Sequence, residues 1–238
     1  MINIITKEEL PSEIAPHYIG WKDFFLSRMK DVRMNHFGWN GEDKNLKAFD
    51  NIHSYIEWFC YHPARPEPYR NYGFYARELS FLSSFMNPKV VVELGTNYGA
   101  GTFMLSNLNP EAKLTTVDIA GIQKAPERQM FDTGVLAKRN NVRCEFVIGL
   151  SWETQLNEKF DFCFIDANHE GWAVWNDSLW ARNNKAEDYL IVWHDVCDEC
   201  SDLIYALAEF SKTIDTPIYK LWDSTCAWTY KKGGNNEP

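Results

Sequence analysis

The sequence lacks long apolar runs and any excess of basic residues. No stretch reaches the ~20 consecutive apolar residues of a membrane-spanning helix, and no charged segment followed by an apolar run marks a signal peptide. Lys and Arg number 24 against 33 Asp and Glu, a formal net charge of -9. Because phosphate binding relies on clustered cationic side chains, this balance disfavours nucleic acid as a partner. We therefore expect a cytoplasmic protein that binds neither membranes nor nucleic acid.

The cysteines show no pattern typical of disulfides. Six cysteines scattered over 238 residues do not suggest a disulfide framework, so we expect buried thiols. Cys197 and Cys200 form a single CxxC pair. A tetrahedral zinc site needs further ligands and a redox pair needs a thioredoxin-like context, so two incidental thiols at a helix start are the favoured interpretation.

Two regions of different character follow one another along the chain. Residues 1–71 are rich in aromatic residues, proline and charge, and apolar spacings of three and four predict helices at 18–30 and 46–60. The proline-rich run at 62–70 interrupts any helix there. We predict a helical N-terminal extension or lid over 1–71, with structural packing as the alternative, and a catalytic domain over 72–238.

Short apolar runs alternate with helix-compatible segments in the second region. The expected strands span residues 89–95, 113–119, 142–149, 160–166 and 188–196, and two strand-like runs within 218–232 predict a terminal hairpin. The expected helices span residues 72–85, 101–108, 123–139, 170–182 and 200–213. This alternation predicts an α/β fold with a doubly wound, mostly parallel, Rossmann-like sheet of seven strands that ends in the antiparallel hairpin.

A glycine-containing turn follows the first of these strands. Gly95 and Gly99 allow a tight turn, and Asn97 is among the few residue types that tolerate a positive φ. Asp118 ends the next strand, where a carboxylate can accept hydrogen bonds from ribose hydroxyls. The spacing is GxxxGxG rather than GxGxxG, and a carboxylate at Glu93 would repel a pyrophosphate but attract a cationic cofactor. A purely structural turn stays open as the alternative.

Four segments together resemble the class I S-adenosylmethionine-dependent methyltransferases: VVELGTNYGAGT, TTVDI, FDFCFIDANHE and VWHDV. Within that class they look most like O-methyltransferases related to the macrocin and cephamycin-pathway enzymes, and more distantly catechol O-methyltransferase. The resemblance implies S-adenosylmethionine as cofactor. It also implies cofactor-binding residues, with Glu93, Gly95, Thr96, Asn97 and Gly99 at the methionine end, Asp118 at the ribose, and Ile119, Gly149, Leu150 and Ser151 at the adenine. Asn97 departs from the common pattern, which bears on the geometry of the loop.

Two carboxylates, Asp166 and Asp195, end adjacent strands of the expected sheet and are the predicted metal ligands. Paired oxygen ligands completed by water are typical of Mg2+. In the catechol-type relatives the matching positions hold a divalent metal that positions and acidifies the acceptor hydroxyl. An Asn follows the second Asp there, whereas this sequence has Val196, and Asp198 is a substitute third ligand. Metal dependence is therefore left open.

Histidines stand beside both carboxylates, and the predicted catalytic residues are His169, His194 and Asp166. Imidazole titrates near neutrality and can take the proton of an acceptor alcohol. His169 is preferred as the base, because the Asp-x-x-His spacing recurs in the macrocin-like relatives. A structural hydrogen bond is the alternative for each histidine, since alignment alone supplies much of the acceleration of an in-line methyl transfer.

The predicted function is O-methylation of a hydroxylated small molecule, such as a sugar or secondary metabolite. The alternatives are a non-methylating enzyme that uses the same cofactor site and a non-catalytic S-adenosylmethionine-binding interaction protein. The Trp and Tyr content makes a homodimer reasonable. Trp172, Trp175 and Trp180 fall on helical spacing and are expected to pack in a core or an interface.

Overall fold

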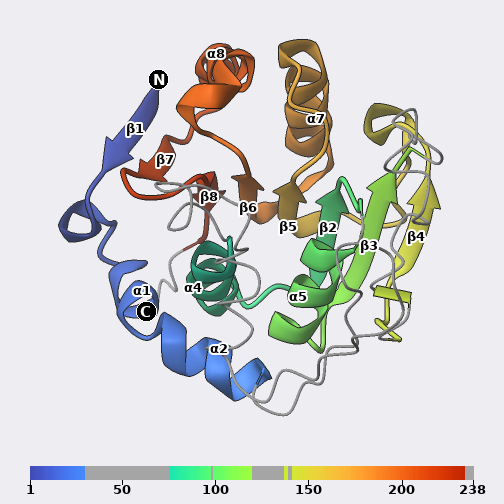
Figure 1. The fold of residues 1–238 in the computed structure, drawn as a ribbon, viewed down its shortest axis with the longest axis horizontal. Coiled ribbons are helices and arrows are strands. Elements are labelled where there is room, and N and C mark those ends of the chain that lie inside the picture. Colours follow the sequence, from blue (N-terminus) through green and yellow to red (C-terminus); the bar gives the residue numbers. More distant parts are fainter. Residues whose placement is uncertain (30–74, 98, 120–136, 139–140, 234–238) are drawn as a thin grey trace, which may run out of the picture.

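An eight-stranded sheet runs through the protein, with helices on both of its faces (Figure 1). The computed structural model describes residues 1–29, 75–97, 99–119, 137–138 and 141–233. In spatial order the strands are β1 (Ile2–Ile5), β7 (Ile218–Leu221), β8 (Ala227–Lys231), β6 (Lys185–Trp193), β5 (Phe160–Ile165), β2 (Val90–Leu94), β3 (Lys113–Asp118) and β4 (Glu145–Ile148).

The order of the strands creates a switch point between β2 and β5. From β2 the chain adds β3 and β4 on one side, and it then returns to add β5 and β6 on the other. All of these neighbours pair in parallel. In sheets of this kind ligands bind beyond the carboxyl ends of the strands, at the point where the strand order reverses. The fold therefore places a ligand site above the ends of β2 and β5.

The predicted α/β fold is confirmed, and the predicted number of strands is wrong. β8 pairs antiparallel with both β7 and β6, so the expected terminal hairpin is present and is inserted into the sheet. The eighth strand is β1, which pairs in parallel with β7 from Ile2 opposite Ile218 to Ile5 opposite Leu221. The N-terminal extension thus begins with a strand. A run of four residues is too short to show the alternation of apolar and polar residues that is typical of a strand. Such a short strand is stabilised only by pairing with another strand, here a distant one.

Six α-helices are described: α1 (Ala15–Ile19), α2 (Trp21–Met29), α4 (Ala76–Met86), α5 (Ala100–Leu108), α7 (Gly171–Asn184) and α8 (Ser201–Phe210). Figure 1 shows α7 and α8 on one side of the sheet, and α4 and α5 on the other. The helix expected at 18–30 is instead divided at Gly20. Those expected at 46–60 and 123–139 fall wholly or almost wholly outside the described residues.

Short 3-10 turns connect several of these elements: η1 (Lys7–Glu9), η4 (Ser151–Glu153), η5 (Asp198–Cys200) and η6 (Ser211–Thr213). The amino-terminal elements pack on the second region, because β1 extends the sheet at β7 and both α1 and α2 contact α4. The predicted boundary between residues 71 and 72 lies outside the described residues and stays a prediction.

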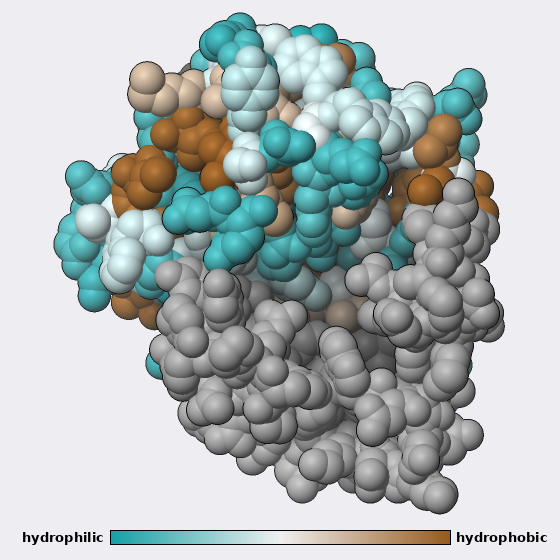
Figure 2. Space-filling view, turned by 45° about the horizontal axis from the view of Figure 1, so that its top comes forward, coloured by the Kyte–Doolittle hydropathy of each residue, from teal (hydrophilic) through white to brown (hydrophobic). Residues whose placement is uncertain are grey.

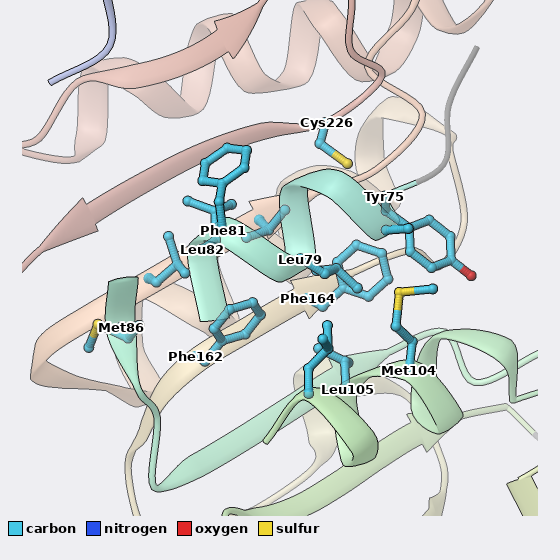
Figure 3. Packing of buried hydrophobic residues seen from close by; sticks show 14 of the residues in the cluster. Tyr75, Leu79, Phe81, Leu82, Met86, Met104, Leu105, Phe162, Phe164 and Cys226 are labelled. Carbon is cyan, nitrogen blue, oxygen red and sulfur yellow. The ribbon is translucent and has the colours of Figure 1, made fainter. Parts of the chain in front are cut away.

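Aromatic and aliphatic side chains of α4 fill the layer between that helix and the sheet. Leu79 and Leu82 are fully buried and lie beside Phe162 and Phe164 of β5, with Leu105 of α5 completing the contact (Figure 3). Burial of each such side chain contributes roughly 1.5–3 kcal/mol. These contacts hold β5 in place against α4 and α5. They thereby also position the loop that follows β5.

Strand β5 is buried on both faces. Its side chains alternate, so that Phe162 and Phe164 belong to the cluster under α4 and α5, whereas Cys163 and Ile165 belong to the cluster under α7 and α8. The two-residue period of a strand produces this division. A central parallel strand that is covered on both faces has a continuous apolar sequence. For this reason β5 could be predicted from the sequence.

The described surface shows no continuous apolar face in the view of Figure 2, where hydrophobic patches are separated by hydrophilic side chains. The predicted homodimer stays a prediction.

Among the described residues no helix is long and apolar enough to cross a membrane. The described cysteines are free thiols, and Cys163 and Cys226 are buried.

Candidate active site

A cleft of about 990 Å³ opens at the carboxyl ends of β2 to β6 and extends to the first turns of α7 and α8. Most of the predicted site residues line it: Gly95, Asn97, Asp118, Ile119, Gly149, Leu150, Ser151, Asp166, His169, His194 and Asp195. Three predicted residues, Glu93, Thr96 and Gly99, lie beside the cleft without lining it. The strand ends thus bring together residues that are as much as a hundred positions apart.

The turn after β2 contains residues with positive φ angles, a conformation that glycine and asparagine tolerate. Gly95, Asn97 and Gly99 have φ angles of 96°, 45° and 88°. A Cβ at Gly95 would overlap the backbone oxygen of Asp166. The glycine therefore allows the turn to approach the loop after β5, and this close approach is to the protein itself rather than to a ligand.

Glu93 is buried at the end of β2, with 1% of its surface exposed. Its Oε2 accepts hydrogen bonds from the hydroxyls of Thr102 and Thr116, the second at 2.6 Å. Burial raises the pKa of Glu93 to about 8, against the opposing effect of these hydrogen bonds. The group is thus largely neutral near pH 7. Contrary to the expectation from sequence, Glu93 puts little charge beside the turn and instead ties β2 to β3 and α5.

Asp118 supplies the carboxylate that faces the cleft at the end of β3. The backbone N–H of Asn97 donates to its Oδ2 at 2.6 Å, which fixes the side chain against the glycine turn. Partial burial raises the pKa of Asp118, and backbone hydrogen bonds from Asn97 and its neighbours oppose this rise. Asp118 therefore lines the cleft with one hydrogen bond already made by the turn, and its role as a ribose ligand stays a prediction.

Two carboxylates and two histidines form a cluster at the ends of β5 and β6. His194 Nδ1 donates to Asp166 Oδ1 at 3.0 Å, and His169 Nε2 lies 3.2 Å from Asp195 Oδ2 and 4.0 Å from Asp166 Oδ1. One ligand atom each of Asp166, His169 and Asp195 lies within 4.8 Å of the others, a spacing that suits a divalent cation. His169, predicted as a base, is thus also placed to be a metal ligand.

Mutual attraction sets the charges of this cluster. Burial favours the neutral forms of Asp166 and His194, yet their pairing outweighs it, lowering the pKa of Asp166 and raising that of His194. The pKa of His169 is also raised, chiefly by Asp166 and then by Asp195, while burial opposes the rise.

The two histidines differ in access. The His169 side chain is 39% exposed, whereas that of His194 is 12% exposed. The His194 ring packs edge-on against Tyr75 with centroids 4.9 Å apart, and its Nε2 is buried without a hydrogen-bond partner. With Nδ1 bound to Asp166, His194 is placed to orient that carboxylate, and His169 is the histidine open to an acceptor.

Several residues of the cleft were missed or misjudged from sequence. Trp172 does not pack in the core, because it is 56% exposed, lines the cleft and makes an edge-on contact with Trp152 at 5.6 Å. The alternative that it packs in an interface stays a prediction. Trp180 is buried, as expected. Asp177 also lines the cleft although it lies in the middle of a helix. Neither Trp172 nor Asp177 stands at a strand end, so no positional signal singled them out.

Comparison with known proteins agrees with this geometry. Residues 92–196 match the family model described as a methyltransferase domain, which spans the cleft from β2 to the end of β6. Residues 92–196 are thus similar to a methyltransferase domain, and the match covers less than half of the chain. The predicted enzyme class is thereby confirmed, and the finer likeness to macrocin and cephamycin-pathway enzymes stays a prediction. No curated protein sequence matches the chain.

A solved methyltransferase structure shares the fold of this chain. The methyltransferase PaMTH1 of Podospora anserina, bound to S-adenosylhomocysteine, has a TM-score of 0.51 and 14% identity, covering 94% of this chain and 89% of its own. An O-methyltransferase of Bacillus cereus in complex with S-adenosylhomocysteine has a TM-score of 0.49 and 17% identity, with 74% and 88% covered. At these identities the likeness to PaMTH1 establishes the fold alone.

A first prediction concerns the two glycines that line the cleft. Gly95→Ala should lower the free energy of unfolding by more than about 1 kcal/mol, because its φ is positive and its Cβ would overlap Asp166. Gly149→Ala is the matched control, since a Cβ there meets nothing within 4 Å, and it should change stability by less than about 0.5 kcal/mol. Urea unfolding of both variants measures this. Equal effects would contradict the proposed close approach.

A second prediction concerns the buried Glu93. Its pKa in the folded state is raised from the model-peptide value of 4.5 to about 8, so the folded state retains a proton that the unfolded state loses. The contribution of Glu93 to stability should therefore fall as pH rises from about 4.5 to 8, by at most about 1.4 kcal/mol per pH unit. Urea unfolding of wild type and Glu93→Gln at pH 5 and pH 8.5 measures it. Parallel pH profiles would refute the shift.

Proposed function

We propose that the methyltransferase domain takes its methyl group from S-adenosylmethionine and transfers it to a hydroxyl oxygen of a small molecule, such as a sugar or secondary metabolite. The observation that carries the proposal is the composition of the single cleft. Cofactor residues expected from three separate strand ends line one half of it, and the Asp–His cluster lines the other. The fold is also the one on which PaMTH1 holds S-adenosylhomocysteine.

Charge in the cleft supports a cationic cofactor. Among the described residues that line it no Lys or Arg occurs, whereas Asp118, Asp166 and Asp195 all contribute carboxylates. The sulfonium and ammonium groups of S-adenosylmethionine are attracted to such a surface, and a pyrophosphate is repelled. Asp118 would accept hydrogen bonds from the ribose hydroxyls, and Gly95 and Asn97 would border the methionine end.

The transfer is an in-line displacement at the methyl carbon. The acceptor oxygen forms a bond to this carbon while the carbon–sulfur bond breaks, which leaves S-adenosylhomocysteine and a methyl ether, and the hydroxyl proton passes to a base. His169 is the proposed base, because it is the more exposed histidine of the cluster. Asp195, 3.2 Å from its Nε2, would stabilise the imidazolium that results.

The same cluster fits a divalent cation. Asp166, His169 and Asp195 would hold it, because one ligand atom of each lies within 4.8 Å of the others. A bound divalent cation would lower the pKa of an acceptor hydroxyl by acting as a Lewis acid. His169 then acts as a ligand instead of a base, and chelation distinguishes the two roles.

Calorimetric titration with S-adenosylmethionine and S-adenosylhomocysteine tests the cofactor site. Wild type should bind both in the micromolar range, and Asp118→Ala should weaken binding at least about tenfold because charged hydrogen bonds to the ribose are lost. Asp215→Ala is the control, because it removes one exposed carboxylate outside the cleft. Absence of binding by the wild type would remove the basis for the proposal.

Turnover of His169→Ala, measured with a panel of hydroxylated acceptors, tests the catalytic half of the cleft. It should fall at least about tenfold while cofactor affinity hardly changes. His17→Ala is the control, because His17 is bonded to Ser84 away from the cleft. Retained turnover in His169→Ala would refute its role. Full wild-type activity after treatment with a chelator would contradict metal assistance and leave His169 as the base.

A further inference from the structure

Asp177 is a buried carboxylate that the reaction described above does not use. It lies two turns into α7, is 2% exposed and borders the same cleft as the predicted cofactor residues. The hydroxyl of Ser151 donates a hydrogen bond to its Oδ1. Burial raises the pKa of Asp177 to about 6, against the opposing effect of this hydrogen bond, so the carboxylate is mostly ionised at neutral pH.

This carboxylate is poorly satisfied by the protein. An ionised carboxylate accepts several hydrogen bonds, and a buried one without donors or a cation is costly. In the part of the chain that the structure describes, Ser151 is its one hydrogen-bond donor, and no Lys or Arg borders the cleft. Asp is also unfavourable in a helix interior. The carboxylate of Asp177 can therefore accept further hydrogen bonds, and a ligand with N–H groups would donate them.

The surroundings of Asp177 indicate what kind of ligand would supply them. Ser151, its partner, follows β4 directly after Gly149 and Leu150, and Ile119 borders the same cleft from the end of β3. Trp152, next to Ser151, contacts Trp172 edge-on. Glycine, aliphatic and aromatic groups of this kind suit the faces of a flat heterocycle. A carboxylate on this side of the cleft can then accept a hydrogen bond from an amino group on the edge of the ring.

We propose that Asp177, oriented by Ser151, accepts a hydrogen bond from the exocyclic amino group of the cofactor's adenine and thereby selects adenine over bases that lack this group. The proposal rests on the proposed use of S-adenosylmethionine. A deaminated base carries a carbonyl oxygen at the same position, which would face the carboxylate oxygen and lose the hydrogen bond. Sites that hydrogen-bond a ligand N–H discriminate strongly against the analogue without it, because their own polar group is left unpaired.

The test compares the affinities of S-adenosylhomocysteine and S-inosylhomocysteine, whose base carries oxygen in place of the amino group, by calorimetry. Wild type should prefer the adenine ligand by about tenfold or more. In Asp177→Asn this preference should disappear or reverse, because the amide can donate to the carbonyl oxygen. Asp202→Asn is the matched control, since it removes another carboxylate of the cleft at an exposed position, and its preference should equal that of wild type.

The outcomes separate this inference from the proposed function. Wild type that binds neither ligand contradicts the use of S-adenosylmethionine itself. Wild type that binds both equally, or an Asp177→Asn variant that keeps the wild-type preference, overturns the role of Asp177 alone. If Asp177→Asn does not fold, the wild-type preference and Ser151→Ala decide the matter, because the unrestrained carboxylate should discriminate less than in wild type.

Discussion

The close packing of the turn after β2 against the loop after β5 is the constraint on which the cleft depends. Gly95 lies against the backbone of Asp166, Asp166 N donates to Leu94 O at 2.8 Å, and Gly95 N donates to Val117 O at 2.8 Å. The ends of β2, β3 and β5 are therefore locked together by backbone contacts. Because Asp118 ends one of these strands and Asp166 follows another, the same contacts set the proposed cofactor half of the cleft beside the Asp–His cluster.

Burial of ionisable groups divides the site into structural and chemical parts. Glu93 is enclosed by hydroxyls and held largely neutral, so it connects strands without contributing much charge. Asp166 is partly buried, but its two histidine neighbours lower its pKa and favour the ionised form. The difference arises because a hydroxyl compensates a buried negative charge only in part, whereas an imidazolium neutralises it. Asp166 therefore carries its charge at the cleft, whereas Glu93 carries little.

The histidines share one electrostatic setting and differ in what they can reach. His194 is bound at Nδ1 and enclosed by Tyr75, which suits a role in positioning Asp166. His169 is more exposed and lies beside Asp195, which can stabilise a proton on the ring or a bound cation. Base and metal ligand are therefore alternative uses of one geometry, since in each the ring of His169 lies beside Asp195.

The sequence by itself determined the alternating strands and helices, the glycine turn, and the carboxylates at strand ends. These are local signals, because apolar runs, positive φ and strand termini depend on neighbouring residues. Only the tertiary structure decided that β1 pairs with a strand more than 200 residues away and that Glu93 turns away from the cleft. It likewise decided that Asp177 and Trp172 border the cleft. Pairing partners, burial and the direction of a helix face depend on which distant elements meet, and no local pattern encodes that.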